Sequence, residues 1–116
     1  MKFFHYPKRN LRKLITKGEY NSAVTLAHEL LEKDPYDTDV LFILAGAYYI
    51  LEDAPSVLRY VDKILEITNS DVEAIMLKAT ALVALGKTKE AINCCKIILK
   101  EQPYNRSAKT MMEKLE

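Results

Sequence analysis

A single interval of 34 residues recurs along the sequence and limits what this chain can fold into. Leu14, Tyr48 and Leu82 share one register position, and Gly18 shares another with Gly86. Three further register positions hold apolar residues in every copy: Ala23, Val57 and Ala91; Leu30, Ile64 and Ile98; Leu31, Leu65 and Leu99. A fixed period in this range is the signature of stacked supersecondary units, none of which buries its apolar face alone. The sequence therefore predicts a repeat array.

Each 34-residue unit is expected to contain two antiparallel helices. Its apolar residues follow a 3- and 4-residue spacing in two stretches, with a short break between them. Pro35, Asn69 and Pro103 stand one interval apart, and each ends an apolar stretch, while Asp53 suits a helix N-cap. The expected helices cover residues 7–16, 20–32, 38–51, 55–67, 71–85 and 89–101.

A seventh helix is expected after Asn105, which can cap it. Its apolar face consists of Ala108, Met111, Met112 and Leu115, with charged residues between them. A terminal helix of this kind covers the open end of a stack and shows water its polar side. We therefore expect an all-α solenoid with a C-terminal capping helix.

Size and composition favour one globular domain. The 116 residues suffice for one modest core, and 49% hydrophobic with 28% charged residues argue against disorder. The longest apolar run, residues 40–51, has 12 residues, whereas crossing a bilayer takes about 20. Lys8 and Arg9 interrupt the place where a signal peptide has its apolar core. We expect no membrane span and no export.

Cys94 and Cys95 are adjacent on a predicted helix, where their side chains diverge by about 100° and a bridge would strain the backbone. No Cys-x-x-Cys spacing occurs, and His5 and His28 are far away in the sequence. We expect ordinary thiols in a reducing compartment, a cytoplasmic location, no metal and no other cofactor.

Catalytic motifs are not found in the sequence. It contains no Gly-rich phosphate loop and no strand-turn-helix setting that would bring a nucleophile to a histidine. A lone histidine on a helix, such as His28, is ordinarily a surface or packing residue. The chain is therefore expected not to be an enzyme.

Charge is unevenly distributed beneath a net charge of +1. Residues 1–17 carry six basic residues and no acid, whereas residues 18–71 carry three basic and eleven acidic residues. The isoelectric point of about 7.7 lies below the basic range of nucleic-acid-binding modules, so we expect no nucleic acid partner. Like charges four residues apart on the first helix, such as Lys8 and Arg12, call for acidic neighbours. These are either Asp34, Asp37 and Asp39 or the surface of a partner.

The units resemble the tetratricopeptide repeat, whose pattern is W-x₂-L-G-x₂-Y, then A-x₃-F, then P. In the central unit the matching residues are Leu41, Leu44, Ala45, Tyr48, Val57, Val61 and Asn69. The third unit keeps Ile75, Ala79, Leu82, Ala91, Cys95 and Pro103, and the first keeps Leu14, Ala23, Ala27 and Pro35. Three positions depart from the pattern: Lys78 replaces a leucine, Val57 replaces an alanine, and Pro7 stands where the pattern has an aromatic residue.

The resemblance implies a right-handed α-solenoid of three repeats, at about 4–37, 38–71 and 72–105, with a capping helix at about 106–116. It also implies that the first helix of each unit lines a concave apolar groove. On that groove we place Phe42, Ile43, Gly46, Tyr49, Ile50, Met76, Leu77, Thr80 and Val83, with Lys8, Arg9 and Arg12 at its first-unit end. Phe42 and Ile50 could equally complete the core, whereas the helical rotation swings Ile43, Tyr49 and Leu77 furthest from the packing stripe or beside the opening.

One specialisation of the family is a clamp that binds the acidic C-terminal tail of cytosolic chaperones. It uses Lys and Asn in the first unit, Asn in the second, and Lys and Arg in the third. The corresponding residues here are Lys8, Arg12, Ile43, Glu73 and Leu77, of which Lys8 alone matches. Isoleucine and glutamate cannot bond a carboxylate. The resemblance therefore implies that no chaperone-tail clamp is present.

The sequence is interpreted as a non-enzymatic adaptor, a protein-protein interaction module that binds a peptide or an amphipathic helix in its groove. An alternative is a homo-oligomeric scaffold that self-associates through the groove or through its N-terminal segment. Residues 1–4, with Phe3 and Phe4, could lie in the groove or merely cover the first unit. A third possibility is an RNA-binding or enzyme-regulatory module.

Overall fold

The structure, a computed structural model, describes residues 7–116. Within this range the chain forms seven α-helices and no strand. They are α1 (Pro7–Thr16), α2 (Tyr20–Lys33), α3 (Thr38–Ile50), α4 (Ala54–Ile67), α5 (Val72–Ala84), α6 (Thr88–Glu101) and α7 (Arg106–Leu115). The ends predicted for the first six helices lie within one residue of these bounds. What we expected of residues 1–4, including the start of the first repeat at residue 4, lies outside the described residues.

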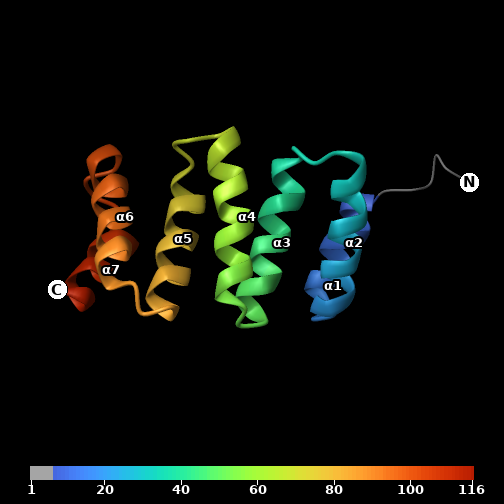
Figure 1. Ribbon diagram of the computed structural model, residues 1–116, viewed down its shortest axis with the longest axis horizontal. Coiled ribbons are helices and arrows are strands. Elements are labelled where there is room, and N and C mark those ends of the chain that lie inside the picture. The colour runs from blue at the N-terminus through green and yellow to red at the C-terminus, as the bar shows by residue number, and fades with distance from the viewer. Residues whose placement is uncertain (1–6) are drawn as a thin grey trace, which may run out of the picture.

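The helices stand side by side in chain order and form an elongated stack that measures 54 × 25 × 21 Å (Figure 1). Successive helices run in opposite directions, so α3 and α5 run in the same direction (Figure 1). The all-α solenoid expected from the 34-residue interval is confirmed.

The N-caps of the odd-numbered helices repeat at the same interval as the core residues. Asp37, Asp71 and Asn105 cap α3, α5 and α7, and each side-chain Oδ1 accepts a hydrogen bond from the backbone N–H three residues later, at 3.3, 3.0 and 2.9 Å. Asp53 caps α4 in the same way and also accepts a 2.7 Å hydrogen bond from the hydroxyl of Ser56. Local cap chemistry therefore explains why the helices begin where they do.

The turns inside the units share a left-handed residue at positions 18, 52 and 86. Gly18 and Gly86 have φ values of 78° and 75°, and Glu52 occupies the equivalent place with a φ of 60°. Glycine adopts this conformation without steric cost, whereas a residue with a Cβ does not. The turn of the central unit therefore has the same left-handed geometry as the other two turns, although the Cβ of Glu52 disfavours that conformation.

Apolar side chains between the helices form three core clusters. The first contains Leu11, Ala23, Ala27, Val40 and Leu44; the second contains Leu41, Ala45, Val57, Val61, Ile64, Ala74 and Ala81; the third contains Ile75, Ala79, Leu82, Ala91, Cys94, Cys95, Ile98 and Ala108. Val57, which departs from the family pattern, is fully buried in the second cluster. No polar or charged residue is buried among residues 7–116. Helix stacking therefore rests on apolar packing, and α7 completes the last cluster through Ala108.

Polar groups at the edge of the core are paired. Lys78, which also departs from the family pattern, forms a 2.9 Å ion pair with Asp62 of α4, and the hydrogen bond to Asp62 raises the pKa of Lys78. His28 Nε2 lies 3.0 Å from the hydroxyl of Tyr48, whose ring stacks on Tyr60 with centroids 5.7 Å apart. His28 is therefore a packing residue.

Candidate binding trough

Three hollows lie between consecutive odd-numbered helices. The first, of 560 Å³, separates α1 from α3 and is lined by Arg12, Ile15, Thr16, Ile43, Gly46, Ala47, Tyr49 and Ile50. The second, of 520 Å³, separates α3 from α5 and is lined by Tyr49, Ile50, Glu52, Ala54, Val57, Thr80, Ala81, Val83 and Ala84. The third, also of 520 Å³, separates α5 from α7 and is lined by Met76, Val83, Arg106, Ser107, Thr110, Met111, Lys114 and Leu115.

Shared residues join these hollows into one continuous trough. Tyr49 and Ile50 line both the first and the second hollow, and Val83 lines both the second and the third. The three side chains are 50%, 47% and 38% exposed. The trough therefore presents a row of uncovered apolar groups, as a partner-binding surface does.

Most of the residues that we placed on the groove line this trough. They are Ile43, Gly46, Tyr49, Ile50, Met76, Thr80, Val83 and Arg12. Phe42 lies in a different hollow, and Leu77 packs against the second core cluster without lining any of the hollows described here. Lys8 is engaged by carboxylates, and Arg9 lines a separate shallow hollow on α1.

The exposure of three residues differs from what the angular argument predicted. Ile50, which it assigned equally to core and groove, is 47% exposed, whereas Ile43 and Leu77 are half-buried and pack against core clusters. Ile50 is the last residue of α3, and the second hollow opens beside it. The exposure of these side chains therefore depends more on which helices lie next to them than on the direction in which the helical rotation points them.

Ile15, Thr16 and Ala84 line the trough but were missed from the sequence. The 34-residue interval could have found them, because Ile15 is in register with Tyr49 and Val83, and Thr16 is in register with Ile50 and Ala84. The residues of α7 that line the trough were also missed, because the sequence predicted only that this helix covers the end of the stack and not that it lines the groove.

An acidic hollow of 820 Å³ lies beside the trough, near the N-terminal ends of α3 and α5. It carries the carboxylates of Asp39, Asp71, Glu73 and Glu101, together with Phe42 and Ile43 among other residues. Arg12 lines both this hollow and the trough. The helix macrodipole favours negative charge at the N-terminal ends of α3 and α5, where Asp39, Asp71 and Glu73 stand, whereas Glu101 is the last residue of α6.

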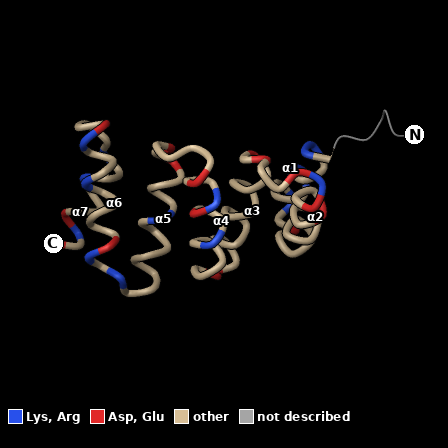
Figure 2. Tube along the Cα trace, turned by 45° about the horizontal axis from the view of Figure 1, so that its top comes forward, with Lys and Arg blue, Asp and Glu red and all other residues tan. Residues whose placement is uncertain are grey.

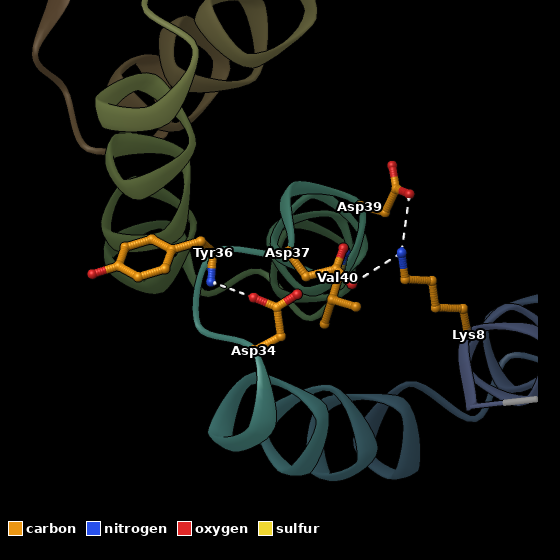
Figure 3. Close-up of polar contacts among 6 residues, drawn as sticks. All are labelled: Lys8, Asp34, Tyr36, Asp37, Asp39 and Val40. Atoms are coloured by element: carbon orange, nitrogen blue, oxygen red, sulfur yellow. Dashed lines mark hydrogen bonds and ion pairs between the residues drawn. The ribbon is translucent and has the colours of Figure 1, made fainter.

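Lys8 pairs with two carboxylates of this region. Its Nζ lies 2.9 Å from Asp37 Oδ2 and 3.3 Å from Asp39 Oδ2, whereas Asp34 accepts a hydrogen bond from the backbone N–H of Tyr36 (Figure 3). Hydrogen bonds to Asp37 and then Asp39 raise the pKa of Lys8. The expected compensation of basic charge on α1 is confirmed for these two aspartates, and Asp34 takes no part in it.

Burial by itself raises the pKa of Asp37, but this effect is outweighed. The hydrogen bonds from Lys8 and from the backbone N–H of Val40 leave the pKa of Asp37 below its ordinary value. Asp37 therefore serves at once as the N-cap of α3 and as the ion-pair partner of α1.

The exposed side of α1 is strongly basic. Arg9, Arg12, Lys13 and Lys17 line a shallow hollow of 380 Å³ together with Thr16. Figure 2 shows this basic helix at the N-terminal end of the stack, with acidic residues nearby. A cluster of four basic side chains thus lies on the helix that forms one end of the trough.

Residues 7–116 contain no cluster of three or more His, Cys, Asp or Glu side chains that could hold a metal ion. In the same range, each helix is too short or too polar to traverse a lipid bilayer. Both cysteines are free and buried, and burial raises the pKa of each thiol.

Comparison with known families identifies the repeat. A family model described as anaphase-promoting complex, cyclosome, subunit 3 matches residues 16–97, which is most of the chain. The chain belongs to this tetratricopeptide-repeat family. The resemblance seen in the sequence is thereby confirmed. No curated protein matches the sequence significantly.

Solved tetratricopeptide domains share the fold. The first such domain of Spaghetti (RPAP3), bound to the HSP90 peptide SRMEEVD, is 23% identical with a TM-score of 0.87, over 94% of this chain and 86% of that one. The second domain of human RPAP3, in complex with the HSP70 peptide SGPTIEEVD, is 21% identical with a TM-score of 0.86, over 94% and 91%. The Arabidopsis OM64 domain is 22% identical with a TM-score of 0.86, over 94% and 90%.

Proposed function

We propose that this tetratricopeptide-repeat chain is a non-enzymatic protein-interaction module whose trough binds an apolar segment of another protein. The observation that carries the proposal is the unbroken row of exposed Tyr49, Ile50 and Val83 along three joined hollows. Covering these side chains on binding would remove apolar surface from water. Two of the similar domains were solved with bound peptides, which supports the use of such a domain as a peptide receptor.

The segment is not the acidic C-terminal tail of a chaperone. Of the five residues at the clamp positions, Lys8 is already held by Asp37 and Asp39. Ile43 and Leu77 offer no side-chain donor, and Glu73 places a negative charge in the acidic hollow. Arg12 is therefore the one clamp position with a cation that no described carboxylate holds, and a terminal carboxylate would be repelled by Glu73 where the clamp requires a donor. We place the module in the cytoplasm, a location that the two free thiols support.

Matched isoleucine variants test the proposal. Ile50 in the trough and Ile97 on α6 are 47% and 50% exposed, so Ile50→Glu and Ile97→Glu make the same change on two different surfaces. Helical peptides with one apolar face are first selected by display on the immobilised wild-type protein. Ile50→Glu should weaken their binding at least about tenfold, because it places a charge in an apolar contact, whereas Ile97→Glu should leave binding unchanged.

Tyr49→Ala should likewise weaken peptide binding. Its control is Tyr104→Ala, which should leave binding unchanged because Tyr104 is 90% exposed outside the trough. Ile43→Glu is less informative, because Ile43 packs against the first core cluster and a charge there would also disturb folding. Circular dichroism verifies that each variant keeps its helices. Equal binding by Ile50→Glu and Ile97→Glu, or failure to select any peptide, would show that the trough is not the receptor.

Self-association is distinguished from partner binding by sedimentation of the wild type across a range of concentrations. A monomer at all concentrations removes the homo-oligomeric scaffold. A dimer that Ile50→Glu dissociates and Ile97→Glu does not would instead identify a second copy of the chain as the occupant of the trough.

A further inference from the structure

Four residues that occupy the same position in successive repeats line the trough, and their charges form a pattern along it. Arg12 of α1, Gly46 of α3, Thr80 of α5 and Lys114 of α7 stand 34 residues apart, and each lines one of the joined hollows. Cations occupy the two end positions, and small residues occupy the two central ones. A Cβ added at Gly46 would meet no atom within 4 Å, so this part of the trough is open.

The two terminal cations are available to a partner. Arg12 and Lys114 are exposed, and neither takes part in an ion pair among the described residues. Arg106 adds a third cation to the α7 end of the trough. Lys8, one turn before Arg12, contrasts with them because Asp37 and Asp39 neutralise it. Arg12 lines the acidic hollow but pairs with none of its carboxylates, so each end of the trough presents a cation that forms no ion pair among the described residues.

The centre of the trough favours a helix over an extended strand. Tyr49, Ile50 and Val83 are its exposed apolar side chains, and the hydroxyl of Thr80 already donates a 3.0 Å hydrogen bond to the carbonyl of Met76. An extended segment would place backbone N–H and C=O groups against this surface without partners. A helix satisfies those groups internally and can lay an apolar face into a groove.

The acidic hollow restricts where the partner can carry negative charge. Asp39, Asp71, Glu73 and Glu101 line the hollow that runs beside the trough, and they would repel a partner's carboxylate that has no cation next to it. A carboxylate at either end would instead meet Arg12 or Lys114. We infer that the occupant of the trough is an amphipathic helix of another protein that carries acidic residues at both ends of its apolar face. This inference rests on the proposed function and specifies its ligand.

A display library of amphipathic helical peptides tests the charge pattern. The peptides are about 20 residues long, which gives about 30 Å of helix. They share one Leu-rich face, and Glu, Lys or Ser is varied independently at the two ends and in the centre. Selection on the wild-type protein should enrich Glu at both ends. Peptides with Lys at both ends should bind about fivefold to tenfold more weakly, and the difference should shrink at high salt.

Charge-reversal variants assign each end of the peptide. Arg12→Glu should invert the preference at one peptide end alone, and Lys114→Glu should abolish it at the other end, where Arg106 remains. Lys96→Glu on α6 removes an exposed lysine outside the trough and should change neither preference. A change of charge preference at one peptide end at a time would not result from general destabilisation of the protein.

The possible failures are distinguishable. Selected peptides with neutral or basic ends, still lost on Ile50→Glu, would overturn the charge pattern and leave the trough as the receptor. Absence of any peptide, or binding that survives Ile50→Glu, would overturn the proposed function and this inference together. Self-association that the peptides displace would identify a second copy as the occupant and would also overturn the inference.

Discussion

The two ends of α3 and α5 border the trough with opposite chemistry. At the C-terminal ends lies the apolar edge, which consists of Tyr49, Ile50, Val83 and Ala84. At the N-terminal ends lies the acidic edge, which consists of Asp37, Asp39, Asp71 and Glu73. The same two helices thus carry exposed apolar side chains at one end and carboxylates at the other.

Helix physics explains the difference. Aspartate satisfies unpaired N–H groups at a helix N-terminus, and negative charge is favoured there, whereas a helix C-terminus favours neither. Because α3 and α5 run in the same direction, their caps add up along one edge of the stack (Figure 1). A local capping rule, repeated every 34 residues, therefore produces a charged edge along the stack. Three predictions test the two edges, in order of decreasing effect.

Asp71→Ala removes an N-cap from the acidic edge. The variant should lose about 1 kcal/mol of stability, because the backbone N–H of Ala74 loses its side-chain acceptor. Glu73→Ala removes a carboxylate from the same edge without removing a cap and should cost only about a few tenths of a kcal/mol. Urea denaturation followed by circular dichroism measures both. Equal losses would mean that charge rather than capping stabilises this edge.

Glu52→Gly changes the turn beside the apolar edge, where Glu52 is the acid in the second hollow. A residue with a Cβ pays about 1–2 kcal/mol in the left-handed region, and the extra freedom of glycine in the unfolded chain returns about 0.5–1 kcal/mol of this. The variant should therefore be more stable by about 0.5–1 kcal/mol. Glu52→Ala, which keeps a Cβ, should show no such gain in urea denaturation, and a similar gain there would refute the conformational explanation.

Asp37→Asn should have the smallest effect, and that effect should depend on pH. Asparagine keeps the cap of α3 but removes the charge that pairs with Lys8. Because the folded pKa of Asp37 is lowered, its ionised form contributes stability above the ordinary value of 3.8, and this is lost as pH falls through the folded pKa. The stability difference between wild type and variant should thus be present near neutral pH and vanish in strong acid. A difference that persists in acid would contradict the ion-pair origin.

Sequence alone determined the elements of this protein and their order. Caps such as Asp53 and Asn105, breaks such as Pro35, and the 34-residue interval act locally or repeat, so they located every predicted helix end within one residue. Contacts between units were decided only by the tertiary structure. Three features depend on which helices lie next to each other. They are the pairing of Lys8 with Asp37 and not with Asp34, the exposure of Ile50, and the part of the trough that α7 lines. Periodicity shows that a helix has an apolar face, but neighbouring units decide how much of that face stays uncovered.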